Sequence, residues 1–382
     1  MVRGPVVGKP YLLREINEQA VLDALRKHGP LSRAALTSRL ALSKSTVSSV
    51  VASLIAHNLV NETPARTRRI GRRPILLEIN PDAGYVVGAD LGASTLRMAS
   101  ADLTGQMRAS LQEPTKAAGL PALLTQLELA LARVVADGGL PRRKVLGFAI
   151  GVPGAVAAGE EIRLCPNLPF LEGVRLRKQL ERRLRIPVVV DNDVNLAAVG
   201  EKWRGCAADV RNFAYIAIGT GVGMGVVLDG ELYRGSSGFA GEVGYLPLPV
   251  DGTYVPVERM ITGPAIARCG QERSALPSSE AVFEAAARGD PAADGIVQDV
   301  ARTVAWAIAC VNTCLDLQLV VLGGGVGGNV SLLLPRVRDQ LARMVPFIPG
   351  VAPSALRGQA ALYGAVAVAL RAGRARARGG RR

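Results

Sequence analysis

The stretch VVVDNDVNLAAVGE, residues 188–201, joins a short apolar run to a helix-like segment through a cluster of polar residues. The apolar run stops at Asp191, and two aspartates and two asparagines lie within residues 191–195. Such compact side chains at the end of a buried strand can cap the next helix, hold a ligand or supply a catalytic base. The stretch alone leaves these three alternatives open.

The sequence around this stretch repeats the pattern of an apolar run that ends in a glycine turn. Helical segments such as 120–136 and 296–315 lie between the repeats. An aromatic content of 4% with 43 glycines also favours an α/β protein with many tight turns. The repeats are GYVVGADLGAS (84–94), VLGFAIGVPGAV (145–156), PVVVDNDVN (187–195), NFAYIAIGTGVGMGVVLDG (212–230) and LVVLGGGVGG (319–328).

A chain of 382 residues is long enough for two or three domains and a large core. We expect no membrane span, because no apolar run reaches the roughly 18 residues that crossing a bilayer requires. The first residues, MVRGPVVGKPY, lack the apolar core of a signal peptide, which favours the cytoplasm. The five cysteines form no CxxC pair, so we interpret them as small buried thiols.

The net charge of +14 is concentrated at the two ends of the sequence. Residues 1–80 carry 13 Lys/Arg against 5 Asp/Glu, and residues 371–382 carry six arginines and no acid. Residues 81–370 are neutral, with 27 basic and 27 acidic residues. A basic head and tail on a neutral body predict a polyanionic partner for the ends. We expect residues 373–382 to form a basic disordered tail, and its contact with that partner stays open.

Residues 1–80 have the pattern of a winged helix-turn-helix domain. A helix is expected over 17–29 with Asn17 as its cap, and a second short helix follows Ser32 as cap. A third helix begins after Ser43, with apolar residues at helical spacing. Two strand-like runs then flank an arginine-rich loop, in the order that a winged helix requires.

The solvent face predicted for the third helix carries mostly small hydroxyl side chains. Its members are Lys44, Ser45, Ser48, Ser49 and Ser53. Short polar side chains allow close approach to base edges in the major groove, and the loop arginines would repel one another without phosphate as a counter-anion. We therefore predict a DNA-binding surface, with a helical domain for protein contacts as the alternative. The candidate residues are Ser32, Arg33, Ser43, Lys44, Ser45, Thr46, Ser48, Ser49, Arg66, Arg68, Arg69, Arg72 and Arg73.

Taken together, residues 11–370 resemble the ROK family of repressors, open reading frames and kinases. The winged helix is typical of the regulator branch, because the plain kinases of the family lack it. The resemblance implies an α/β, actin-like (ribonuclease H-like) sugar-kinase-type body of two lobes around a cleft, usually in a homo-oligomer. The segments that carry it are GADLGASTLR (88–97), GVPG (151–154), CPNLPFLEGVRL (165–176), DNDVNLAAVGE (191–201), GTGVGMGVVLDGELYRGSSGFAGEVG (219–244) and LGGGVG (322–327).

The resemblance also implies the domain boundaries. We expect a winged helix at 1–80, a first lobe at 81–190 joined by a C-terminal helix at 360–372, and a second lobe at 191–359 with the sugar-site and oligomerisation elements.

In kinases of the family, the aspartate that matches Asp193 removes a proton from the attacking sugar hydroxyl. The resemblance makes Asp193 a vestigial base candidate and implies that Asn192 binds a sugar hydroxyl. Capping of the next helix is the alternative for both residues. The full set of sugar-binding candidates is Asn167, Asn192, Asp193, Glu242, Tyr245 and Glu258.

The first phosphate turn departs from the family pattern of two glycines followed by a Thr-Lys pair. Here Ala93, Ser94 and Thr95 stand in the turn, so a methyl group is added and the lysine charge is missing. The phosphate grip is therefore weakened, and we expect neither ATP as a cofactor nor kinase activity. The nucleotide-site remnant is Asp90, Gly92, Thr220, Gly221, Gly323 and Gly324.

The family's zinc site uses a histidine after GE-x-G and three cysteines in a CxCGxxGC run. This sequence has Tyr245 in the histidine position and no cysteine between Cys206 and Cys269. The two histidines, His28 and His57, belong to the predicted DNA-binding head. We therefore expect no metal. Tyr245 also replaces a side chain that touches the sugar in the family.

These observations predict a sequence-specific transcriptional regulator, a repressor of carbohydrate-related genes, whose kinase-like cleft senses a sugar or sugar phosphate. A homodimer or homotetramer would bind a pseudo-palindromic operator. Two alternatives stay open: a DNA-binding regulator with a vestigial cleft, and an active sugar kinase that also binds DNA. A fourth hypothesis, suggested by the arginine-rich tail, is a DNA-binding protein without sequence preference.

Overall fold

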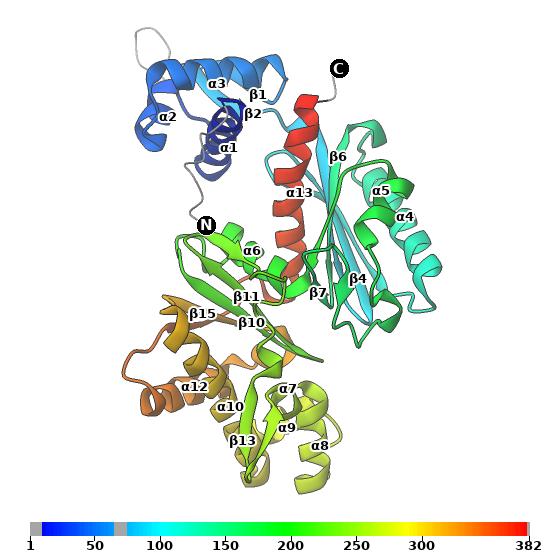
Figure 1. The fold of residues 1–382 in the computed structure, drawn as a ribbon, viewed down its shortest axis with the longest axis vertical. Helices are drawn as coiled ribbons and strands as arrows, with labels where there is room; N and C mark the ends of the chain where they lie inside the picture. Colours follow the sequence, from blue (N-terminus) through cyan, green and yellow to red (C-terminus); the bar gives the residue numbers. More distant parts are fainter. Residues whose placement is uncertain (1–9, 65–74, 380–382) are drawn as a thin grey trace, which may run out of the picture.

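The computed structural model describes residues 10–64 and 75–379, which form a head and two lobes (Figure 1). The head contains three helices and a hairpin: α1 (Pro10–His28), α2 (Arg33–Leu40), α3 (Lys44–Ala56), β1 (Val60–Pro64) and β2 (Ile75–Ile79). The two strands are antiparallel, and Leu31 pairs with Leu77 of β2 through two backbone hydrogen bonds. The winged helix-turn-helix predicted from the sequence is confirmed.

Two serines start the second and third helices as predicted. Ser32 Oγ accepts a hydrogen bond from the Ala35 amide at 3.2 Å, and Ser43 Oγ accepts one from the Thr46 amide at 3.0 Å. These bonds satisfy amides that have no partner within the helix. The Ser43 bond also fixes the end of the turn between α2 and α3.

Two expectations for the head were wrong. Helix α1 begins at Pro10, so Asn17 lies inside it instead of capping it. Proline suits a first helical turn, and the Leu, Arg and Glu residues that follow it favour helix. Ser53 was expected on the solvent face but is buried, because it lies beside Leu54 on the apolar stripe of α3. The loop arginines Arg66, Arg68, Arg69, Arg72 and Arg73 lie outside the described residues.

The first lobe is built on a five-stranded sheet in the order β5-β4-β3-β6-β9. The strands are β3 (Tyr85–Leu91), β4 (Thr95–Asp102), β5 (Met107–Pro114), β6 (Val145–Val152) and β9 (Val188–Asn192). The first three are antiparallel, and β6 and β9 run parallel to β3. Helices α4 (Leu120–Asp137) and α5 (Leu176–Leu184) cover one face (Figure 1).

The second lobe repeats this topology with the order β12-β11-β10-β15-β16. The strands are β10 (Phe213–Ile218), β11 (Val222–Leu228), β12 (Glu231–Tyr233), β15 (Leu319–Gly323) and β16 (Gly350–Pro353). Two copies of three antiparallel strands followed by two parallel ones form the predicted actin-like body.

Shorter elements decorate the two lobes. They are η1 (Pro81–Ala83), η2 (Arg142–Lys144), β7 (Ala155–Val156), β8 (Ile162–Arg163), η3 (Pro169–Leu171), η4 (Val243–Tyr245), β13 (Pro247–Val250), β14 (Thr253–Pro256), α7 (Glu258–Ile261), α8 (Gly263–Ser274), α9 (Ser279–Ala287), α11 (Gly324–Gly327) and η5 (Arg357–Gln359).

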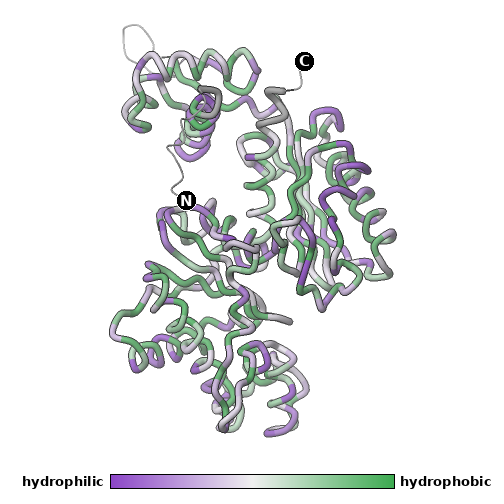
Figure 2. Tube along the Cα trace, viewed as in Figure 1, coloured by the Kyte–Doolittle hydropathy of each residue, from purple (hydrophilic) through white to green (hydrophobic). Residues whose placement is uncertain are grey.

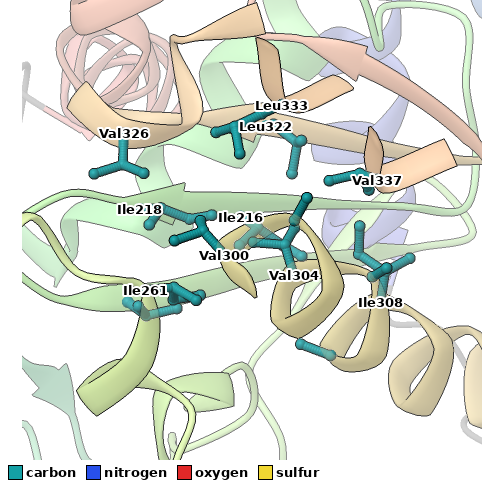
Figure 3. Close-up of a cluster of buried hydrophobic side chains, with 14 of the residues drawn as sticks. Ile216, Ile218, Ile261, Val300, Val304, Ile308, Leu322, Val326, Leu333 and Val337 are labelled. Carbon is teal, nitrogen blue, oxygen red and sulfur yellow. The ribbon is translucent and has the colours of Figure 1, made fainter. Parts of the chain in front are cut away.

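The core of the second lobe lies between its sheet and two long helices, α10 (Pro291–Leu315) and α12 (Val330–Met344). Figure 3 shows Val300, Val304 and Ile308 of α10 facing Ile216 and Ile218 of β10. These residues recur at helical spacing in α10 and at every second position in β10, so each element presents one apolar face. Figure 2 shows the same preference along the trace, with hydrophobic segments in the strands of both sheets.

Two helices cross between the lobes. α6 (Asp193–Arg204) follows the last strand of the first sheet and packs on β10 and β11, whereas α13 (Ala360–Gly379) follows the last strand of the second sheet and packs on β3 and β6. A Cβ atom at Gly364 would overlap the carbonyl oxygen of Leu196, and one at Gly200 would overlap that of Ala360. The two glycines therefore allow α6 and α13 to meet backbone to backbone at the junction of the lobes.

The C-terminal prediction was partly wrong. Residues 373–379 were expected to be disordered, but they continue α13, which ends at Gly379. Alanine and arginine alternate there, and both are strong helix formers. The expected boundary between residues 190 and 191 also falls inside β9, so the first sheet extends to Asn192.

Two further observations concern the exposure of the cysteines and the hydropathy of the helices. Cys206 and Cys314 are exposed, so the expectation of buried thiols was wrong for them, while Cys165 is buried. Among the described residues, no helix has the length and hydropathy needed to cross a bilayer.

Candidate functional site

A cavity of about 350 Å³ lies between the two lobes. Turns and helix starts from both sheets form its wall, including the residues after β3, β9 and β10. All six residues predicted to bind a sugar line this cavity: Asn167, Asn192, Asp193, Glu242, Tyr245 and Glu258. The first phosphate turn, residues 92–95, and the second, residues 219–221, line it as well. The candidates that the family resemblance implied therefore lie close together in the structure.

The polar cluster that ends β9 divides into two pairs. Asp191 and Asn195 are buried, and Asn195 Nδ2 donates to Asp191 Oδ1 at 3.1 Å. Asn192 caps α6, because its Oδ1 accepts from the amides of Val194 and Asn195, and its Nδ2 donates to the Gly154 carbonyl. The capping alternative is thus realised for Asn192, although the same side chain also lines the cavity.

Asp193 is a carboxylate whose protonation the cleft strongly affects. One of its oxygens accepts the Val194 amide at 2.8 Å. Part of its surface reaches the cavity, but burial by the surrounding protein, followed by repulsion from Asp90 and then Glu242, raises its pKa to about 8. A carboxyl with a pKa in this range can carry a proton near neutral pH and then donate as well as accept.

The opposite wall is also acidic. Burial raises the pKa of Glu242, and the nearby charge of Glu258 raises it further. Tyr245 is half exposed on the rim of the cavity, where burial and then Glu258 raise the pKa of its phenol. The wall therefore offers carboxyl, amide and phenol groups, the chemistry that pairs with the hydroxyls of a neutral polyol.

A larger cavity of about 940 Å³ continues from the first. Of the predicted nucleotide remnant, Asp90 and Gly323 line this larger cavity, and Gly92, Thr220 and Gly221 line the smaller one. Gly324 lines both. A Cβ atom at Gly323 would overlap the Tyr215 hydroxyl, so glycine is required there. The Gly92 amide donates to the Thr95 carbonyl at 2.9 Å, which shows that the first turn closes despite Ala93.

Sequence reasoning missed Arg97, which lines both cavities. Its Nη1 donates to Asp90 Oδ2 at 3.3 Å and partly offsets the rise that burial causes in the pKa of Asp90. Arg97 lies two residues after Thr95 on β4, so the alternation of a strand places both side chains on one face. That spacing was the signal that could have found it.

The head presents the start of α3 to solvent at the end of the molecule farthest from the second lobe (Figure 1). Lys44, Ser45, Ser48 and Ser49 are exposed there, and Thr46 is half buried. Arg33 forms an ion pair with Glu62 of β1 at 2.6 Å, so this candidate already has a partner inside the head. The exposed side chains lie in the first two turns of α3, the part of a recognition helix that contacts bases.

The described residues contain no group of three His, Cys, Asp or Glu side chains placed to hold a metal ion. Cys206 donates to Glu201 through both its amide and its thiol.

A winged helix-turn-helix head on a two-lobed, sugar-kinase-like body defines the class of this protein. Its sequence matches the profile of the ROK family over residues 86–372, and the chain belongs to that family. Residues 17–70, which make up most of the head, match the profile of the MarR family.

Relatives with known names include both regulators and kinases. The chain is 34% identical over 247 residues to the putative xylose repressor of Caldicellulosiruptor sp. (strain Rt8B.4), a match that covers 63% of this chain and 61% of that protein. It is 26% identical to the xylose repressor of Bacillus spizizenii over 89% of this chain and 90% of that protein. The glucokinase of Halalkalibacterium halodurans is 28% identical over 67% of this chain and 84% of the kinase. The chain thus spans about three fifths of the length of the first repressor.

Among solved structures, a ROK family transcriptional regulator described as a homologue of the Escherichia coli MLC protein superposes with a TM-score of 0.83. The superposition covers 96% of this chain and 99% of the regulator at 24% identity. This likeness supports the fold of head and body together.

Proposed function

We propose that the chain is a DNA-binding, sugar-responsive transcriptional repressor. The observation that carries this proposal is the joining of two sites in one chain. An exposed serine-rich face lies on α3 of a winged helix, and six polar side chains converge on one cavity of the body. The names of the xylose repressors that resemble most of the chain support the same function.

We propose a neutral sugar as the effector. Asp193, Glu242 and Glu258 face the smaller cavity, and its cation Arg97 already pairs with Asp90. An anionic sugar phosphate would meet repulsion from the carboxylates of Glu242 and Glu258, and Asp193, which keeps its proton near neutral pH, offers no countercharge. The hydroxyls of a neutral sugar can form hydrogen bonds with all three groups. D-Xylose is the first candidate, because two of the similar repressors carry its name.

Effector binding in the cleft would change the position of the head through contacts at the end of α1. Arg26 donates to the Leu103 carbonyl of the first lobe through Nε at 3.1 Å and Nη2 at 2.8 Å. Lys27 pairs with Asp209, which lies between α6 and the second sheet, at 2.8 Å. One turn of α1 therefore contacts both lobes, so a change in the angle between them would move the head.

The repressor would act in the cytoplasm as a homodimer or homotetramer on a pseudo-palindromic operator. We propose that it needs neither zinc nor ATP. Metal analysis of the purified protein should then find far less than one zinc per chain, and chelator treatment should leave the melting temperature unchanged. Zinc at one per chain that resists dialysis would reject this part of the proposal.

Residual sugar kinase activity is the second candidate, because the phosphate turns still close and Asp193 occupies the position of the family's base. The missing lysine and the added methyl of Ala93 argue against it. ATP- and sugar-dependent ADP release that Asp193→Asn abolishes would support a kinase.

The test is binding of the purified protein to its own upstream DNA at physiological salt, with D-xylose, D-glucose and their phosphates. We expect one neutral sugar to change the DNA affinity about tenfold, which corresponds to about 1.4 kcal/mol of coupling. Glu242→Gln should reduce this response, whereas Glu284→Gln, an exposed control on α9, should keep it. Tight DNA binding that no sugar alters would favour a vestigial cleft, and a response to phosphates alone would reject the neutral effector.

A further inference from the structure

A third cavity, of about 500 Å³, lies where the head meets the body. Its walls come from α1 of the head, from α6 and β12 of the body, and from α13. None of its residues lines either cavity of the cleft. Its volume falls in the range of small-molecule sites, about 300–1,000 Å³. The site is therefore separate from the proposed sugar site.

The floor of this cavity is apolar. Val227 and Leu370 are almost fully buried, and Val199, Leu232 and Ala367 continue the surface. The indole of Trp203 forms part of the wall and packs at 6.3 Å from the ring of Tyr363. A flat aromatic wall beside an aliphatic floor favours the ring or chain of an organic molecule over a bare ion.

The rim of the cavity carries more positive than negative charge. The cations are Arg26, Lys27, Lys202, Arg204 and Arg371, and the acids are Asp23 and Glu231. Arg26 pairs with Asp23 and Lys27 with Asp209, each at 2.8 Å, and Arg371 lies 3.8 Å from Glu231. Within the described residues, no carboxylate lies in ion-pair distance of Lys202 or Arg204.

These two cations are held in place by other contacts. The Lys202 ammonium donates to the carbonyls of Ala208 and Val210 at 3.2 and 2.8 Å. The Arg204 guanidinium lies over the Trp203 indole, 4.3 Å from its centre. Burial, with repulsion from Lys27, lowers the pKa of Lys202. An anion bound beside the Lys202 ammonium would favour its charged form and so counter the effects of burial and of the Lys27 charge.

We propose that this cavity binds a small amphipathic anion, an aromatic carboxylate or sulfonate, with its ring on the apolar floor and its charge at Lys202 and Arg204. Because α1 forms one wall, the occupant ties the head to the body. The chain would then respond to two small molecules, one in the cleft and one beneath the head.

The probe for the test is 8-anilinonaphthalene-1-sulfonate, which joins a sulfonate to aromatic rings. The chain has two tryptophans, so Trp306→Phe leaves Trp203 as the sole indole reporter. We expect saturable quenching of Trp203 and an increase in the probe's Kd of at least tenfold in Lys202→Gln and Arg204→Gln. Arg302→Gln, an exposed control on α10, should keep the Kd. Equal affinity in all three variants would overturn the proposal.

Hydrogen exchange of the unaltered protein supplies a readout that does not depend on the folding of variants. Saturating probe should slow exchange in residues 20–28 and 202–210 together, because the occupant contacts both segments. Slowed exchange confined to the cleft, or none at all, would overturn the proposal. Neither measurement involves DNA or a sugar, so the result is independent of the proposed repressor function.

Discussion

Asp191 and Arg234 form an ion pair that joins the two lobes beside the smaller cavity of the cleft. Asp191 Oδ2 accepts from Arg234 Nη2 at 2.6 Å and from Nε at 3.1 Å. Asp191 is nearly buried at the end of β9, and Arg234 follows β12 of the other sheet. The other oxygen of Asp191 accepts from the Asn192 amide and from Asn195. Asp191 therefore holds the start of α6 in place, while Asn192 and Asp193 face the cavity.

Arg234→Ala should lower the free energy of unfolding by about 1–3 kcal/mol, because it leaves a buried carboxylate without its charged donor. Chemical denaturation measures this loss. Adding Asp191→Asn should recover part of it, since the amide removes the unpaired charge. Arg211→Ala is the control: its pair with Asp229 is exposed on both sides and should contribute about 0–1 kcal/mol. Equal losses in the two arginine variants would contradict this role.

Asp193→Asn should stabilise the protein more at high pH than at low pH. The folded state keeps the Asp193 proton up to about pH 8, whereas the ordinary pKa is 3.8. As the pH rises through this window, the unfolded state ionises first, so stability is lost towards pH 8. The asparagine has no charge to bury. The melting temperature of the variant minus that of the wild type should be larger at pH 9 than at pH 5, and a pH-independent difference would reject the raised pKa.

Gly364→Ala should destabilise the junction of the lobes, because the new methyl group overlaps the Leu196 carbonyl of α6. We expect a loss of about 1–3 kcal/mol, typical of an overpacked contact. Gly295→Ala in α10 is the matched control: its Cβ meets open space, and alanine favours helix by about 0.5–1 kcal/mol. If both alanines stabilise, the two helices are not in backbone contact.

Ser48→Asp should weaken operator binding at least tenfold at physiological salt. Ser48 is exposed on α3, and a carboxylate there would face the phosphates and acceptor groups of the major groove. Ser110→Asp adds the same charge on β5 of the body and should leave the affinity unchanged. Fluorescence anisotropy with labelled DNA gives both affinities. If both variants weaken DNA binding equally, the DNA does not bind at the exposed face of α3.

Local patterns predicted most of the head and the order of the body. A serine before an apolar helical stripe predicts a cap, and Ser32 and Ser43 have that role. The arrangement of the cleft residues followed from the family resemblance, since strand ends far apart in sequence meet only in three dimensions. Whether these residues bind a sugar stays a prediction.

Other features depended on contacts that no local pattern shows. The Asp191–Arg234 pair depends on how the two sheets face each other. The spacing of residues in the sequence therefore could not show that Asp191 joins the lobes whereas Asp193 lines the cavity. The cavity beneath the head needs α1, α6 and α13 to meet, although these elements lie far apart in sequence. The helical end of α13 could have been predicted from the sequence, because alanine and arginine both favour helix. We instead interpreted the run of arginines as a sign of disorder.

The measurement that tests the central claim most directly is the affinity of the protein for the sugar, determined twice by calorimetry, once free and once bound to its operator. Coupling between two sites is reciprocal. If the sugar lowers the DNA affinity about tenfold, the operator must lower the sugar affinity by the same factor, about 1.4 kcal/mol. We predict this matched pair of shifts. An unchanged sugar affinity on the operator would contradict a cleft that controls the head.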